Sequence, residues 1–187
     1  SGFISAHDVN PADRPAYIVS TDTYRVAKLA VEHLAELGHR SIGCVGFGGR
    51  APDEALSGRI YPRDNAYLGC LAALNESGIS EQFLLGVPRR HDERDFQAWK
   101  YTCLAHQLSS LDRIPSAFVC IGDFRAASLL RVLRDRNLRI PGDVSVAGMG
   151  NTPWADALDP PLTSVCLGEE KMARMALMFN EEPEPAD

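Results

Sequence analysis

Short apolar runs alternate with longer segments whose apolar residues recur every three or four positions. The apolar runs lie at 16–20, 42–47, 83–87, 117–121 and 144–148. The helical spacing lies at 23–37, 64–77, 93–109, 124–137 and 169–179. Strands that alternate with helices of this length are typical of repeated βα units around a parallel sheet. The pattern therefore predicts an α/β fold.

Two segments sharpen this prediction. The run Ala117–Ile121 is apolar without interruption, as expected of a central parallel strand that is buried on both faces. The helix predicted at 23–37 is followed by Gly38, which can adopt the left-handed conformation that ends helices.

The stretch from Arg139 to Val165 holds the most informative loop. Pro141 and Gly142 predict a turn, because proline fixes φ and glycine tolerates positive φ. The strand at 144–148 follows, and the loop 149–158 then leaves the carboxyl end of that strand. Open α/β sheets bind ligands at this edge, so we expect a binding site there.

Composition narrows the function classes. The net charge of −6 and the isoelectric point near 5.4 provide no overall basic field for nucleic acid, and the arginines of 124–137 are read as a solvated helix face. The five cysteines are scattered without a CxxC pair, which favours reduced thiols. Neither a membrane-length apolar run nor a secretion signal is present in these residues, so a cytoplasmic protein with no membrane role is expected.

Catalytic and cofactor motifs are incomplete. The Gly46–Gly49 segment follows a strand but completes neither GxGxxG nor GxxxxGK[ST]. The five histidines lack the spacing of a metal site, and no GxSxG elbow occurs. We therefore expect no cofactor, no metal and no enzyme activity.

Several ordered motifs together resemble the effector-binding domain of LacI/GalR-type transcriptional regulators. They are IVSTDTYRVAKLAVEHLAELGHRSIGCVGF, PSAFVCIGDFRAASLLRVL, RIPGDVSVAGMGN and PPLTSV. The resemblance implies two Rossmann-like lobes of the periplasmic-binding-protein-like type I, with one lobe incomplete. It covers about Ala16 to Phe179 and implies an effector bound between the lobes.

The resemblance also implies where the lobes divide. Residues 1–36 and 163–187 would form a partial amino-terminal lobe, and residues 37–162 the carboxyl-terminal lobe. Asp22 would open the helix beside the crossover between lobes, and Pro160–Thr163 would return the chain to the first lobe. The chain is expected to begin inside that lobe, after a separate helix-turn-helix headpiece, and to end before its last strand.

Five residues are candidates for effector contact: Arg63, Arg90, Asp123, Asn151 and Trp154. Asp123 could bind a ligand hydroxyl or cap the helix that it precedes, and Trp154 could stack on a ring or pack under its loop. Arg63 could be an ordinary surface residue. Arg90, with Arg89 and His91, could favour an anionic effector or form a solvated turn.

The family pattern is not complete at these positions. Gly122 and Gly150 stand where sugar-binding members often have Asn and Asp, so two polar ligands for a sugar hydroxyl are absent.

The expected function is effector sensing and dimerisation. A small metabolite, such as a sugar or sugar phosphate, would shift a homodimer between two lobe arrangements and so alter operator binding by the headpiece. The alternative is a soluble solute-binding protein of the periplasmic type. An upstream helix-turn-helix segment or a secretion signal would discriminate between the two.

Overall fold

The structure is a computed structural model that describes residues 19–46, 62–79, 81–86 and 96–180. It divides into two compact units. The first comprises Ser1–Asp22 and Leu167–Asp187, and the second comprises Thr23–Cys166. Each unit is described by itself below.

The second unit alternates strands and helices, as predicted. Its helices are α1 (Thr23–Glu36), α3 (Pro62–Glu76), α4 (Phe96–Ser109), α5 (Asp123–Asp135) and α6 (Pro153–Ala157). Its strands are β1 (Ser41–Val45), β2 (Glu81–Leu85), β3 (Ala117–Cys120), β4 (Ser145–Gly150) and β5 (Thr163–Cys166).

The strands form one parallel sheet in the order β2-β1-β3-β4-β5. All four residues of β3 are buried, which confirms the prediction of a central strand. The order reverses between β1 and β3, because β2 extends the sheet from β1 in one direction and β4 and β5 extend it in the other. Sheets wound in this order bind ligands where the order reverses, at the carboxyl ends of the strands.

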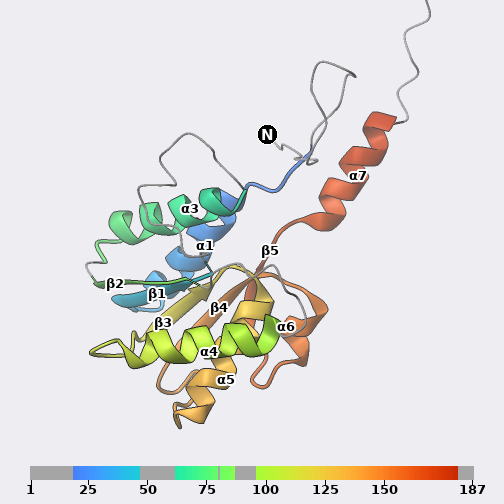
Figure 1. The fold of residues 1–187 in the computed structure, drawn as a ribbon. Coiled ribbons are helices and arrows are strands. Elements are labelled where there is room, and N and C mark those ends of the chain that lie inside the picture. Colours follow the sequence, from blue (N-terminus) through green and yellow to red (C-terminus); the bar gives the residue numbers. More distant parts are fainter. Residues whose placement is uncertain (1–18, 47–61, 80, 87–95, 181–187) are drawn as a thin grey trace, which may run out of the picture. The chain divides into compact units, whose positions relative to one another are not determined.

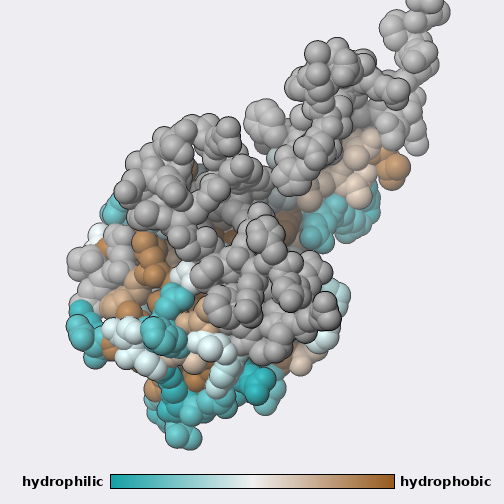
Figure 2. Space-filling model, in the orientation of Figure 1, coloured by the Kyte–Doolittle hydropathy of each residue, from teal (hydrophilic) through white to brown (hydrophobic). Residues whose placement is uncertain are grey.

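Helices cover both faces of the sheet. In Figure 1, α1 and α3 lie on one face, and α4 and α5 lie on the other. The core under α4 and α5 includes Leu104, Leu108, Phe118, Leu129 and Leu133, all nearly inaccessible to solvent. Figure 2 shows hydrophilic residues over the outer surface around α5, where Arg131 and Arg134 are exposed, as expected of a solvated face. Arg136 differs, because it is half-buried and donates to the Ala105 carbonyl oxygen at 2.8 Å.

The helices α1 and α3 approach each other closely. The backbone of Gly69 in α3 passes the Tyr24 carbonyl group of α1 with no room for a side chain. Lys28 of α1 pairs with Glu76 of α3 at the surface, and this bond raises the pKa of the lysine. The helix predicted at 23–37 thus packs within the second unit, and Gly38 ends it with φ of 94°.

Two segments belong to the second unit by their packing. Residues 23–36 and 163–166, which the resemblance assigns to the partial amino-terminal lobe, both lie in this unit. The first packs on α3 as α1, and the second pairs with β4 as β5. Pro160–Thr163 therefore leads into an edge strand of the same sheet, and the chain changes unit after Cys166. The amino-terminal change of unit falls after Asp22, beside the helix that this residue was expected to open.

Some helices and strands begin or end a few residues away from the predicted positions. The strand predicted at 83–87 occupies Glu81–Leu85, and β4 extends to Gly150 rather than ending at 148. The strand predicted at 16–20 falls mostly outside the described residues, and Val19 and Ser20 are not in a strand. The loop 48–62 lies outside the described residues except for Pro62, which begins α3.

The turn before β4 is closed by an ion pair. The Arg139 guanidinium donates to both carboxylate oxygens of Asp143, at 2.6 and 2.9 Å, and the Arg139 backbone N–H donates to the same carboxylate at 2.8 Å. These bonds hold the pKa of Asp143 at about 2. They span the predicted turn at Pro141–Gly142 and fix the approach to β4.

The five cysteines are free thiols. Cys44, Cys70 and Cys120 are buried in the core, where burial raises the pKa of Cys120, and contact with Cys44 together with burial raises the pKa of Cys70. They pack as small apolar residues, as predicted. Among the described residues, no helix has the length and apolar content needed to cross a membrane.

The first unit contains α7 (Glu169–Asn180) among its described residues. The hydroxyl of Thr21 donates to the Leu167 carbonyl oxygen at 2.9 Å and lies 3.1 Å from the Met172 sulfur. These contacts join the segment before α1 to the start of α7.

Candidate functional site

The candidate residues Asp123, Asn151 and Trp154 lie at one edge of the sheet. Asp123 follows β3, and Asn151 follows β4 directly. Parallel strands present their carboxyl ends at the same edge, so these segments meet there. The structure thus brings together three of the five candidate residues.

The Asp123 carboxylate is the polar centre of this edge. It is 1% exposed and accepts three hydrogen bonds. One oxygen accepts from the Thr152 backbone N–H and from the Thr152 hydroxyl, both at 2.8 Å, and the other accepts from the Ser164 hydroxyl at 2.6 Å. A buried carboxylate requires such compensation, because an uncompensated charge in the interior is costly.

Of the two roles considered for Asp123, helix capping is wrong. The N-cap of α5 is Gly122, with φ of 102°, and no side-chain capping bond is present. Asp123 is the first residue of the helix, and its carboxylate turns toward Thr152 and Ser164 instead. The physical reason is that a neighbouring strand and loop offer donors to the carboxylate at this position.

Two glycines make room for the carboxylate. A Cβ on Gly148 would lie 2.5 Å from Asp123 Oδ1 and 2.7 Å from a methyl carbon of Leu162. A Cβ on Gly150 would lie 3.1 Å from Asp123 Oδ2, and Gly150 also has φ of 135°. Gly150, which stands where sugar-binding members of the family often have Asp, thus borders the carboxylate.

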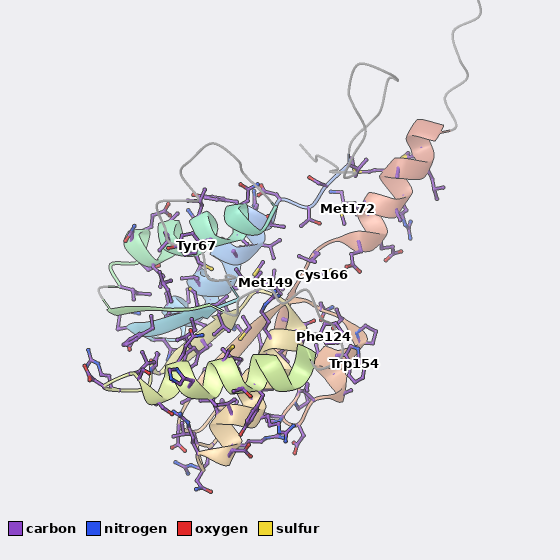
Figure 3. All side chains as sticks on the ribbon, in the orientation of Figure 1. Tyr67, Phe124, Met149, Trp154, Cys166 and Met172 are labelled. Carbon is purple, nitrogen blue, oxygen red and sulfur yellow. The ribbon has the colours of Figure 1, made fainter. Side chains whose placement is uncertain are left out.

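Asn151 and Trp154 are exposed at this edge. Asn151 has φ of 48°, and its backbone N–H donates to Ser164 Oγ at 2.9 Å. Trp154 is 58% exposed and does not pack under its loop. Its ring lies 6.0 Å from that of Phe124, at an interplanar angle of 53°, and Figure 3 shows the two side chains next to each other. The pair offers an accessible aromatic surface next to a polar loop.

The loop that carries Asn151 and Trp154 is ordered by a short helix. Thr152 is the N-cap of α6, and Pro153 follows at the first helical position, where its lack of an N–H has no cost. The Leu162 N–H donates to the Ala155 carbonyl oxygen at 2.9 Å, which joins α6 to the segment before β5.

Arg125 lies where the strand order reverses. Its Nη1 donates to the Ile121 carbonyl oxygen at 2.5 Å, directly after β3. A Cβ on Gly46, directly after β1, would lie 2.9 Å from Arg125 Cδ. The side chain therefore spans the carboxyl ends of β1 and β3 and places a cation at this edge.

The side chains of the two candidate arginines lie outside what the structure describes. Arg63 lies in the first turn of α3, and its side chain is outside what the structure describes. Arg90, with Arg89 and His91, falls outside the described residues.

Sequence reasoning missed Phe124, Arg125, Thr152 and Ser164. For Phe124 and Arg125, a signal was available, because they follow Asp123 and begin a helix at a strand's carboxyl end. Ser164 had no local signal, since its role depends on pairing opposite Gly148.

The chemistry of this edge suits binding. It offers a carboxylate whose hydrogen bonds are internal, an exposed amide, two aromatic rings and one guanidinium. Within the described ranges, no group of three or more His, Cys, Asp or Glu residues could hold a metal ion.

Comparison with known proteins identifies the fold family. Residues 31–179 match the periplasmic binding protein-like domain family. The chain belongs to this family. The match covers most of the chain and confirms the resemblance on which the fold prediction rested.

Curated relatives of this periplasmic binding protein-like domain are transcriptional regulators. The chain is 32% identical over 179 residues to an uncharacterized HTH-type transcriptional regulator of Streptomyces limosus, covering 94% of this chain and 46% of the relative. It is 30% identical over 148 residues to the HTH-type transcriptional repressor PurR of Vibrio atlanticus, covering 79% of this chain and 40% of the repressor. The chain therefore spans about half the length of the relatives it matches, or less.

A solved structure shows the same fold. A LacI family transcriptional regulator from Enterococcus faecium, with bound ribose, superposes with a TM-score of 0.64 at 24% identity. The superposition covers 87% of this chain and 57% of that one. The α/β fold of periplasmic-binding-protein-like type is thereby confirmed.

Proposed function

We propose that this periplasmic binding protein-like domain is the effector-sensing and dimerisation part of a LacI/GalR-like transcriptional regulator. In this proposal, a small metabolite binds at the carboxyl edge of the sheet and alters operator binding by a headpiece elsewhere in the protein. The observation that carries the proposal is the exposed Phe124–Trp154 pair beside Asn151, at the edge where open α/β sheets bind ligands.

Regulation is favoured over solute transport by the relatives. Both curated relatives described above are named as HTH-type regulators, and neither is named as a transport protein or an enzyme. A cytoplasmic homodimer without enzymatic activity is the form expected of such a regulator.

The site chemistry favours a ligand with a hydrogen-bonding group next to an apolar ring face. The Asn151 amide can donate and accept, and aromatic rings bind the faces of other rings. Arg125 adds a donor group where the strand order reverses, which would suit an acceptor on the ligand. Arg63 and Arg90 remain proposed contacts for an anionic group.

A thermal-shift screen tests the proposal. The probes are ribose, because a LacI family regulator of this fold was solved with it, and panels of other sugars, sugar phosphates, nucleobases and small acids. A ligand at about 100 times its dissociation constant stabilises a protein by about 2.7 kcal/mol, which is readily measured as a rise in Tm. A Tm that none of these classes raises contradicts the proposal.

Variants locate the site once a ligand is found. Asn151→Gly removes the amide and tolerates the positive φ, and Trp154→Ala removes one ring. Each should raise the dissociation constant roughly fivefold, since one such contact is worth about 1 kcal/mol. Asp112→Asn, in an exposed segment before the amino end of β3, is the control and should bind normally.

A further inference from the structure

The hydrogen-bonding capacity of Asp123 is largely used within the protein. A carboxylate offers about four acceptor positions, and three donors already occupy those of Asp123. The side chain is 1% exposed, so a ligand hydroxyl has almost no access to it. Direct effector contact therefore does not explain why a carboxylate is buried here.

The donors come from two segments that are distant in sequence. Thr152 belongs to the loop after β4, and Ser164 belongs to β5. Ser164 Oγ also accepts from the Asn151 N–H at 2.9 Å, so its hydroxyl links that loop to the carboxylate a second time. We call Asp123, Asn151, Thr152 and Ser164 the Asp123 network.

This network determines where the exposed site residues lie. Thr152 lies between the exposed Asn151 and helix α6, which carries Trp154. Its backbone N–H donates to the Asp123 carboxylate, so this bond holds both neighbours in place. Asn151 is held at φ of 48°, a conformation that few residues adopt without local support. Phe124, the ring partner of Trp154, is the neighbour of Asp123 in the chain.

We propose that Asp123 is a positioning residue of the effector site: through Thr152 and Ser164 it fixes the loop that presents Asn151 and Trp154, and the effector contacts those residues rather than the carboxylate. The proposal rests on the proposed function, because it assumes that an effector binds at this edge of the sheet. The positioning itself concerns the ligand-free protein and can be tested without a ligand.

The test is amide hydrogen exchange followed by NMR on the whole chain. Asp123→Leu removes every acceptor at similar size, whereas Asp123→Asn can still accept from Thr152 through its oxygen and donate to Ser164 through its NH₂ group. The Thr152 amide should exchange roughly tenfold or more faster in the Leu variant, and within about threefold of wild type in the Asn variant. The Val119 amide, in the central strand, serves as the reference for global stability.

A second pair of variants covers the case in which the Leu variant does not fold. Thr152→Val removes only the hydroxyl donor, and Thr152→Ser keeps it. Relative to the intrinsic exchange rate of each residue type, the amides of residues 152 and 155 should exchange faster in the Val variant than in the Ser variant, with Val119 unchanged in both. Equal exchange in the Asn and Leu variants, or in the Ser and Val variants where Asp123→Leu is unfolded, overturns the proposal.

The two proposals can fail separately. If no probe in the thermal-shift screen raises the Tm but exchange follows the expected order, the effector function is wrong and the positioning role stands. If a ligand binds while exchange is indifferent to these substitutions, the positioning role is wrong.

Discussion

A methyl group on Gly69 of α3 would lie 2.1 Å from the carbonyl oxygen of Tyr24 in α1. No real Cβ approaches a backbone oxygen so closely, so one of the two helix backbones would have to shift. The contact between α1 and α3 therefore depends on a position that lacks a side chain.

Gly69→Ala should destabilise the second unit. In an open helix this change would stabilise by about 0.5–1 kcal/mol, because alanine loses less backbone entropy than glycine. Here overpacking should dominate and lower the free energy of unfolding by about 2 kcal/mol. Urea unfolding followed by circular dichroism measures the difference.

The matched control for this prediction is Gly142→Ala. At Gly142 the nearest atom is the Cβ of Arg139 at 3.3 Å, a contact that a shift of a few tenths of an ångström relieves, and φ is not in the left-handed region. The urea midpoint of the Gly142→Ala variant should stay near that of wild type. A Gly69→Ala protein as stable as this control would show that the helices can separate slightly at little cost.

Gly148→Ala should disturb the Asp123 network, because Gly148 of β4 borders the Asp123 carboxylate. The new methyl group would lie 2.5 Å from Asp123 Oδ1, so the carboxylate or β5 must shift. We expect a loss of about 2 kcal/mol in the free energy of unfolding, measured in urea. In a double-mutant cycle with Asp123→Ser, whose shorter side chain relieves the contact, the two losses should be less than additive. Additive losses would place the strain elsewhere, for example at Leu162.

The Arg139–Asp143 pair should make stability depend on pH in acid. The pKa of Asp143 is held at about 2 in the folded protein, below the ordinary value of 3.8, so the unfolded chain binds this proton more readily. The contribution is fully present above about pH 4 and is lost as the pH falls toward 2. Urea midpoints of wild type and Asp143→Asn should therefore differ at pH 6 and converge as the pH falls from 4 to 2.

Asp112→Asn serves as the control in this series, since it also removes one exposed carboxylate. A difference between wild type and Asp143→Asn that is the same at pH 6 and pH 2.5 would mean that the ion pair does not carry the effect.

Local patterns predicted most of the fold. The continuous apolar run at Ala117–Ile121 identified the central strand, because only a strand buried on both faces needs such a run. The helix at 23–37 and its end at Gly38 were likewise encoded by neighbouring residues. Boundaries were less accurate where a strand's end is set by its partner, as for β2 and β4.

The unit boundary and the role of Asp123 could not be obtained in this way. Pro160 and Pro161 suggest a break, but whether Thr163 continues the same sheet depends on pairing with β4. The partners of Asp123 lie 29 and 41 residues further along the chain. Only the strand register brings Ser164 opposite Gly148 and next to the carboxylate.

The single carboxylate shared by two distant segments also constrains how this domain can evolve. A substitution at residue 123 that removes the acceptors leaves the Thr152 and Ser164 donors to be satisfied in some other way, and a bulkier residue 148 leaves no space for the carboxylate. Related sequences should therefore covary at positions 123, 148 and 164, with acidic, glycine and hydroxyl residues inherited as a set.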